Sequence, residues 1–227
     1  MIFVANYKMN GDKNFYKKVN KIFKRKFKDT IVLCPPFIYM PFFNLKNQKV
    51  CLGSQDISIE QNKQSTGQIS AKMLNEFGVK YSIIGHSERR AIGETDEVIA
   101  LKVKYAQENN ITPIVCVGEK TKTAKLDVLV EQVEKALSLV ENNNIIFAYE
   151  PIWAIGSGEV PTVLKINKAL KMIKDTAKKK DLDVEVLYGG SVNISNHKEL
   201  KSSIADGFLM GGVSLKLNDF IKIVEGE

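Results

Sequence analysis

Short apolar segments recur along the whole chain. Most are rich in Val, Ile and Phe and are continuously apolar rather than alternating, which is typical of strands buried on both faces of a parallel sheet. We predict strands at residues 2–5, 30–34, 50–53, 81–85, 112–117, 145–149, 184–188 and 207–210. Between them lie stretches with helical periodicity, among them residues 96–109, 126–140 and 163–180.

The number and spacing of these elements predict the fold class. Successive strands are about 30 residues apart, as repeated strand-helix units require. Eight such units without a linker or a shift in composition favour a single-domain α/β protein, a closed (β/α)8 barrel over residues 1–227. An open doubly wound sheet is less favoured, because it needs fewer strands and usually a GxGxxG turn after the first strand, where this chain has Asn6-Tyr7-Lys8-Met9-Asn10.

Composition and charge are those of an ordinary globular chain, with one basic segment. The net charge of +7 raises nucleic acid as a partner, chiefly through residues 13–28, which hold five lysines and Arg25 between positions 17 and 26. Apolar Phe15, Val19, Ile22 and Phe23 recur there at helical spacing. We therefore predict a helix with one packed face and a solvated lysine face, and no nucleic-acid partner.

Other features bear on location. Apolar runs are too short for a membrane helix, and residues 1–5 meet a polar turn too soon for a signal peptide, so we expect a cytoplasmic protein without a membrane partner. Cys34, Cys51 and Cys116 are odd in number and far apart, each inside an apolar run, which indicates buried reduced thiols rather than disulfides or a zinc site.

Chemically useful residues follow the predicted strands. In a barrel, functional groups gather where strands end, on the C-terminal rim. Asn6 and Lys8 follow the first strand, His86, Ser87 and Glu88 the fourth, and Glu119 and Glu150 the fifth and sixth. Gly189-Gly190-Ser191 and Gly211-Gly212 follow the last two. There barrels often bind phosphate through backbone N–H groups, and Ser191 adds a hydroxyl donor; ordinary tight turns are the alternative.

The chain has only two histidines. His86 ends an apolar strand and opens a polar turn, so its ring is expected at the barrel mouth; a core histidine is the alternative. His197 lies in a polar helical stretch and is expected on the surface. No second His or Cys stands at metal-ligand spacing, so we predict no metal.

Glu150 is followed by an unusually apolar loop with the only tryptophan of the chain. Folded over the site, the loop would desolvate the carboxylate and make it a stronger base. Gly156 and Gly158 would let the loop change shape. The alternative is a solvated carboxylate or an ion pair with Lys8.

Together these motifs resemble the triosephosphate isomerase family. They are Asn6-Tyr7-Lys8-Met9-Asn10, Gly85-His86-Ser87-Glu88-Arg89-Arg90, Cys116-Val117-Gly118-Glu119, residues 149–159, Tyr188-Gly189-Gly190-Ser191 and residues 207–212, in family order. The resemblance runs from Ile2 to about Leu217 and implies the barrel known as the TIM barrel.

The resemblance implies cofactor-independent interconversion of dihydroxyacetone phosphate and glyceraldehyde 3-phosphate through an enediolate, in glycolysis and gluconeogenesis. It makes Glu150 the base and neutral His86 the electrophile, with Lys8 and Asn6 as further catalytic and substrate-binding residues. Gly156, Ser191, Gly211 and Gly212 would hold the phosphate, and Glu88 and Cys116 would support the site. The lid would comprise Pro151, Ile152, Trp153, Ala154, Ile155, Gly156, Ser157 and Gly158.

The resemblance also implies a homodimer. The polar loop at residues 54–67 would reach a second subunit, with Thr66 contacting the partner's site; a mobile surface loop on a monomer is the alternative. Two departures stand out: Tyr7 replaces the usual Trp, and Glu159 replaces a usual Lys at the far end of the lid. Another phosphate-sugar barrel, an epimerase or a synthase, is the enzymatic alternative, and a nucleic-acid-binding or non-catalytic barrel is the alternative from another class.

Overall fold

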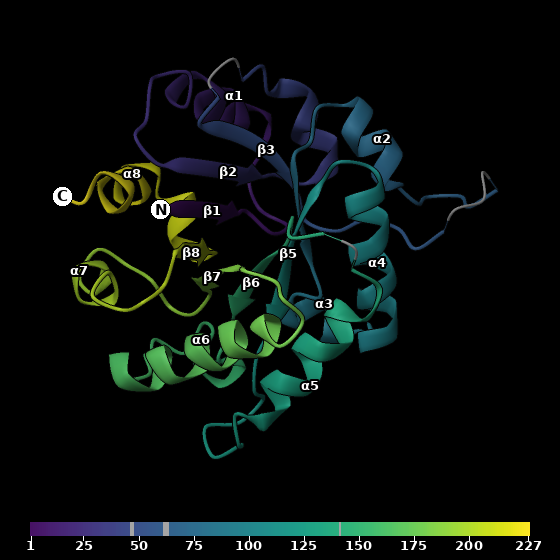
Figure 1. The fold of residues 1–227 in the computed structure, drawn as a ribbon. Coiled ribbons are helices and arrows are strands. Elements are labelled where there is room, and N and C mark those ends of the chain that lie inside the picture. The colour runs from purple at the N-terminus through teal and green to yellow at the C-terminus, as the bar shows by residue number, and fades with distance from the viewer. Residues whose placement is uncertain (46–47, 61–63, 141) are drawn as a thin grey trace.

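The strands form a closed parallel barrel in chain order (Figure 1). The computed structural model describes residues 1–45, 48–60, 64–140 and 142–227. Within them the strands are β1 (Ile2–Asn6), β2 (Thr30–Cys34), β3 (Val50–Ser54), β4 (Tyr81–Ile84), β5 (Thr112–Val117), β6 (Ile146–Tyr149), β7 (Glu185–Tyr188) and β8 (Gly207–Met210). Pairing of β1 with β8 closes the barrel, with Ile2 opposite Gly207. The predicted fold class and all eight strands are confirmed, with ends shifted by at most one residue.

Helices surround the barrel. They are α1 (Lys13–Ile22), α2 (Ala71–Glu76), α3 (Ser87–Ala91), α4 (Asp96–Glu108), α5 (Asp127–Ala136), α6 (Val163–Lys178), α7 (His197–Leu200) and α8 (Leu217–Glu225), with 3-10 helices η1 (Phe37–Phe42), η2 (Leu137–Leu139), η3 (Ile152–Ala154) and η4 (Gly212–Leu215). Side-chain oxygens of Asp12, Ser70, Thr95 and Thr162 accept backbone N–H groups at the starts of α1, α2, α4 and α6. Such N-caps satisfy amides that have no partner within a helix. No helix among the described residues is long and apolar enough to cross a membrane.

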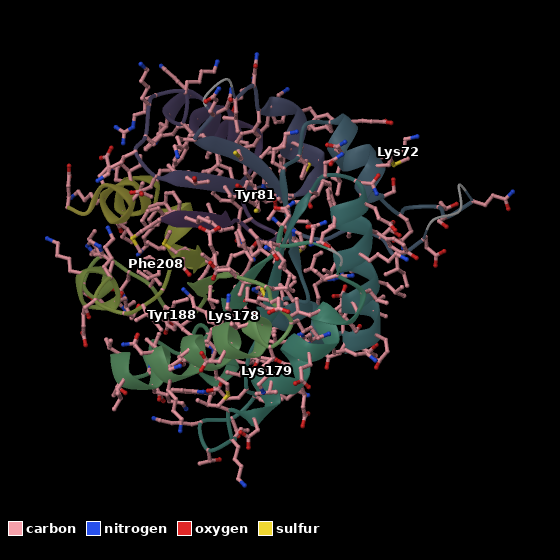
Figure 2. All side chains as sticks on the ribbon, viewed as in Figure 1. Lys72, Tyr81, Lys178, Lys179, Tyr188 and Phe208 are labelled. Atoms are coloured by element: carbon pink, nitrogen blue, oxygen red, sulfur yellow. The ribbon has the colours of Figure 1, made fainter. Side chains whose placement is uncertain are left out.

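The core has two layers because side chains alternate along each strand. One set fills the barrel interior and includes Val4, Cys34, Ile114 and Leu209. The other set packs against the helices, and Phe208 and Tyr188 belong to it (Figure 2). Full burial of one such large apolar side chain contributes about 1.5–3 kcal/mol relative to exposure.

Glycine is required where β8 meets β1. A Cβ atom at Gly207 would lie 1.8 Å from the carbonyl oxygen of Ile2, far inside any permitted contact. Replacing Gly207 would therefore force apart the strands that close the barrel.

The basic segment folds partly as predicted. Val19 is buried on α1 while Lys17, Lys18 and Lys21 are exposed, as an amphipathic helix requires. The helix ends at Ile22, however, and not near residue 28. The residues between α1 and β2 return the chain to the barrel, and Phe27 stacks on Phe23 with 5.5 Å between ring centroids.

Two predictions about buried side chains are wrong. His197 is fully buried at the start of α7 rather than on the surface. The prediction failed because the sequence neighbours of His197 are polar, whereas the fold directs this side chain into the interior. Cys51 is half-buried, unlike the fully buried Cys34 and Cys116, because it lines an open pocket together with Phe77 and Lys80.

Candidate active site

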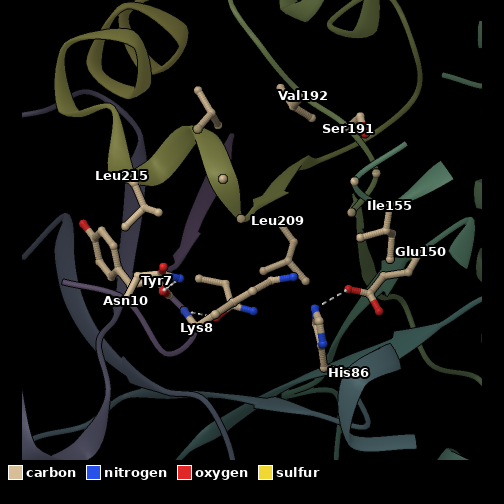
Figure 3. Close-up of a pocket in the computed structure, with 17 residues that line it drawn as sticks. Tyr7, Lys8, Asn10, His86, Glu150, Ile155, Ser191, Val192, Leu209 and Leu215 are labelled. Atoms are coloured by element: carbon tan, nitrogen blue, oxygen red, sulfur yellow. Dashed lines mark hydrogen bonds and ion pairs between the residues drawn. The ribbon is translucent and has the colours of Figure 1, made fainter. Parts of the chain in front are cut away.

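A cavity of ≈ 380 Å³ opens at the C-terminal ends of the strands (Figure 3). All residues that the sequence marks as catalytic or substrate-binding line it: Asn6, Lys8, His86, Glu150, Gly156, Ser191, Gly211 and Gly212. Its wall also contains Tyr7, Asn10, Ile155, Gly189, Gly190, Val192, Leu209, Val213 and Leu215. The structure thus brings together side chains from β1, β4, β6, β7 and β8 and the loops that follow them.

Glu150 follows β6 directly and is almost fully buried. Its Oε1 lies 3.1 Å from His86 Nε2, and its Oε2 accepts the Ser87 backbone N–H at 3.0 Å. Figure 3 shows the Glu150 and His86 side chains pointing toward one another. The carboxylate is therefore desolvated and held by two donors, rather than solvated or paired with Lys8.

His86 has a defined tautomer. It caps α3, and its Nδ1 accepts the backbone N–H of Glu88 at 3.2 Å. A nitrogen that accepts an N–H carries no proton, so the neutral ring bears its proton on Nε2. That Nε2–H faces the cavity and Glu150.

Lys8 lies across the cavity with an unusual backbone. Its φ of 50° is in the left-handed region, which costs a residue with a side chain about 1–2 kcal/mol. Two hydrogen bonds hold it there: the Lys8 N–H donates to Asn6 Oδ1 at 3.0 Å, and Gln55 Nε2 donates to the Lys8 carbonyl at 2.9 Å. Lys8 Nζ pairs with Glu88 Oε1 at 2.6 Å. The strain aims the ammonium group of Lys8 into the site.

Close packing around Glu150 depends on two glycines. A Cβ at Gly118 would lie 1.7 Å from the Glu150 carbonyl oxygen, and one at Gly189 would lie 3.0 Å from Glu150 Cγ. The buried Cys116 lies nearby, and its pKa is raised well above the usual range, first by burial and then by the Glu150 charge. Cys116 therefore acts as a neutral packing group beside the carboxylate and not as a nucleophile.

Only part of the predicted lid lines this cavity. Within residues 151–158, Ile155 and Gly156 reach the cavity wall, Pro151 and Ala154 are buried, and Ile152, Trp153, Ser157 and Gly158 do not line the cavity. The Ser191 hydroxyl donates to the Ala154 carbonyl at 2.9 Å and so connects the predicted lid to the loop after β7. Glu88 contacts the site through Lys8.

Thr66 is exposed and away from this cavity. The predicted loop that carries it, residues 54–67, includes residues 61–63, which lie outside the described residues.

The sequence did not identify three groups that help to position Lys8 and Glu150. Gln55 follows β3, and the rule that rim residues follow strands could have found it. Gly189 was read only as part of a phosphate turn. The Ser87 amide gives no side-chain signal, because any residue supplies a backbone N–H.

Within the described residues, no group of three or more His, Cys, Asp or Glu side chains could hold a metal ion. The donors in the cavity wall include the His86 imidazole, the Lys8 ammonium group, the Ser191 hydroxyl and the glycine turns after β7 and β8. This set suits an oxyanion with a nearby proton acceptor.

Known proteins resemble the chain over its full length. The sequence model of the triosephosphate isomerase family matches residues 1–227. A triosephosphate isomerase of Gloeothece citriformis is 38% identical over 239 aligned positions, covering 99% of this chain and 98% of the relative. One of Thermoanaerobacter pseudethanolicus is 41% identical over 213 positions, covering 87% and 86%. One of Buchnera aphidicola subsp. Cinara cedri is 39% identical over 247 positions, covering 99% and 97%.

Proposed function

Since the chain belongs to the triosephosphate isomerase family, we propose that Glu150, His86 and Lys8 carry out the isomerisation characteristic of that family. The enzyme interconverts dihydroxyacetone phosphate and glyceraldehyde 3-phosphate, a step of glycolysis and gluconeogenesis. The family match favours this activity over those of an epimerase or a synthase, the enzymatic alternatives that the sequence had left open. The geometry of the individual residues supports the roles proposed for them.

One observation carries the proposed mechanism: the Glu150 carboxylate and the His86 Nε2–H are 3.1 Å apart in a cavity that Lys8 also lines. The carboxylate removes a proton from the carbon beside the carbonyl of the substrate. The electrons of that C–H bond form the carbon–carbon double bond of the enediolate, and negative charge moves to the carbonyl oxygen. The His86 Nε2–H and the Lys8 ammonium group stabilise that charge. The hydroxyl proton of the adjacent carbon then moves to the charged oxygen, and Glu150 returns its proton to the former carbonyl carbon, so that the carbonyl group forms on the adjacent carbon.

The substrate must separate Glu150 from His86 before either can react. Both side chains use their reactive atoms on each other in the structure. The carbonyl oxygen of a bound substrate would accept a hydrogen bond from the His86 N–H, and the C–H group of the substrate would lie against the Glu150 carboxylate. The structure therefore corresponds to a resting arrangement.

Phosphate binding is assigned to the turns after β7 and β8. Gly211 and Gly212 line the cavity, and η4 begins at Gly212. Glycine lets backbone amides approach an anion closely. Ser191 and Gly156 complete the proposed phosphate site, and the lid over it would exclude water from the enediolate.

Isomerisation in deuterated water tests the mechanism. The reaction starts from dihydroxyacetone phosphate. Transfer through Glu150 lets the abstracted proton exchange with solvent, so the glyceraldehyde 3-phosphate formed should carry deuterium on carbon 2. Glu150→Gln should abolish both turnover and labelling. Direct hydride transfer would leave the product unlabelled and would refute the assignment.

Activity should survive exhaustive chelation, because the proposed groups are side chains that need no metal or cofactor.

A homodimer is proposed from an exposed apolar surface. Ile38, Met73 and Phe77 are exposed by 73%, 59% and 48%, a large amount for apolar side chains. Met73 and Phe77 line an apolar cavity of ≈ 180 Å³ together with Phe37, Met40, Pro41, Ile69 and Leu74. Thr66, in the connection from β3 to α2, is also exposed. Burial of both features in a second copy would remove this apolar area from water.

Sedimentation velocity tests the dimer. The wild type should sediment as a dimer, and Met73→Glu should shift it toward monomer, because a charge would be buried at the interface. Exposed Lys72→Glu on the same helix is the matched control. A monomeric wild type would refute the proposal.

We also propose a single catalytic domain over residues 1–227 and a cytoplasmic location. All three cysteines are unpaired thiols, as expected in a reducing compartment. Fractionation of cells expressing the tagged protein would test the location.

A further inference from the structure

The indole ring of Trp153 connects the lid to the loop after β5. Its Nε1–H donates to Glu119 Oε1 at 2.9 Å, and the Tyr149 hydroxyl donates to the same oxygen at 3.0 Å. Glu119 is buried, so loss of either hydrogen bond would leave this carboxylate with fewer donors away from water, which costs free energy. Trp153 is therefore fixed at one edge of its ring.

Two lysines lie over the same ring. Lys165 Nζ, from the first turn of α6, is 4.9 Å from the ring centroid, and Lys122 Nζ, from the loop between β5 and α5, is 5.3 Å away. Both distances are within the range of a cation–π contact. Lys165 Nζ also donates to the Lys122 carbonyl at 3.2 Å, which joins the two elements. We call Lys122, Trp153 and Lys165, with the carboxylates of Glu119 and Glu159, the Trp153 clamp.

The carboxylates balance the lysine charges. Glu159 Oε2 pairs with Lys122 Nζ at 2.7 Å, and Glu119 Oε1 lies 3.4 Å from Lys165 Nζ. Glu159 thus places a negative charge against Lys122 at the far end of the proposed lid. A lysine at position 159 would place a third cation against Lys122 and weaken the clamp.

The clamp is close in the chain to Glu150. Trp153 lies three residues after it in η3, which is closed by hydrogen bonds from Ala154 N to Pro151 O at 2.8 Å and from Ile155 N to Ile152 O at 3.2 Å. These hydrogen bonds link residues 151–155 to one another. We therefore expect displacement of Glu150 from His86 and Ser87 by a substrate to displace Trp153 as well.

We propose that Lys122 and Lys165 are positioning residues that hold the lid in its resting conformation through Trp153, and that ligand binding releases the ring from them. This inference rests on the proposed function, in which Glu150 is the base and residues 151–158 form the lid. Ligand binding then works against the clamp, because a ligand shifts a conformational equilibrium only by its differential affinity for the two states. Weakening the clamp should tighten ligand binding.

The test uses Lys122→Gln, with Lys120→Gln as the matched control. Lys120 is an exposed lysine of the same loop, so both variants lose one positive charge near the site. The probe is a two-carbon phosphate carrying a carboxylate, which resembles the enediolate, titrated against the emission of Trp153, the only tryptophan. Thermal unfolding of each variant establishes that it is folded.

Lys122→Gln should bind the probe about two- to fivefold more tightly than wild type, the size expected for one cation–π contact at an exposed site. Its emission without ligand should move toward the spectrum of the liganded wild type. Lys165→Gln should do the same, and Lys165→Arg should restore wild-type behaviour, because guanidinium keeps the charge and stacks on aromatic rings.

Two failures are distinguishable. If the probe leaves wild-type Trp153 emission unchanged while it inhibits the enzyme, the lid assignment itself is wrong. If wild-type emission responds but Lys122→Gln and Lys165→Gln behave like Lys120→Gln, the lid stands and the clamp is refuted. Weaker probe binding by Lys122→Gln than by Lys120→Gln would also refute it.

Discussion

Glu150 and His86 contact one another through the atoms that we propose react with the substrate, with 3.1 Å between the carboxylate Oε1 and the ring Nε2. The Ser87 amide holds the other carboxylate oxygen at 3.0 Å. A substrate must therefore exchange a hydrogen-bonded pair inside the protein for its own contacts with both groups. Because Glu150 directly precedes the proposed lid, we expect this exchange to couple the proposed chemistry to the position of residues 151–158.

Shortening the base should affect the chemical step most. Glu150→Asp keeps the charge but retracts the carboxylate by one methylene group, and a displacement near 1 Å costs on the order of 10² in rate. We expect kcat to fall by about that factor and KM to change much less, because the base acts in the transition state. Steady-state kinetics in both directions measures this. An unchanged kcat would place the base elsewhere.

Gly189→Ala should displace the base without changing its chemistry. The new Cβ would lie 3.0 Å from Glu150 Cγ and 3.3 Å from the Tyr149 carbonyl, so the side chain must yield by a few tenths of an ångström. A roughly threefold to tenfold fall in kcat should follow. Gly212→Ala is the contrast, since no atom lies within 4 Å of its Cβ and it lines the proposed phosphate site. It should act on KM, and equal effects of both variants on kcat would contradict this.

Lys8→Met should remove charge stabilisation of the enediolate while keeping most of the side-chain bulk. Loss of one donor to a developing oxyanion typically costs about 10²–10³ in rate. We expect kcat/KM to fall by at least that factor. Lys18→Met, on the exposed face of α1, removes the same net charge far from the cavity and should retain wild-type kinetics. Comparable losses in both variants would show that overall charge, and not Lys8 itself, matters.

Stability should fall with pH below neutrality because of His197. Burial lowers the pKa of this fully buried ring, nearby Lys201 and Lys198 act in the same direction, and the backbone of Glu227 opposes them. A histidine whose pKa is lower in the folded state contributes stability that is complete above its unfolded pKa of about 6.5 and is lost as pH falls toward the folded value.

Thermal unfolding of wild type and His197→Leu between pH 5 and 8 checks this. The variant should lose less stability on acidification than the wild type. Leu200→Ala, which removes buried packing from the same helix without removing a titratable group, is the control and should keep the wild-type slope. Parallel curves for wild type and His197→Leu would exclude the His197 contribution.

The eight strands and the residues that follow them were determined by the sequence itself. Continuous apolar runs such as residues 112–117 can only be buried in a sheet covered on both sides, and eight of them in parallel close into a barrel. Closure then brings every strand end to one rim, so Lys8, His86 and Glu150 had to meet. Local periodicity is sufficient for such predictions because it depends on neighbours in the chain.

Only the tertiary structure decided which groups touch one another. His197 is buried although its sequence neighbours are polar, because α7 turns that position inward. Glu150 pairs with His86 rather than with Lys8, which pairs with Glu88. Lys122 and Lys165 are 43 residues apart in sequence and still share the Trp153 ring. Such contacts depend on distances through space between distant segments, and periodicity along the chain carries no information about them.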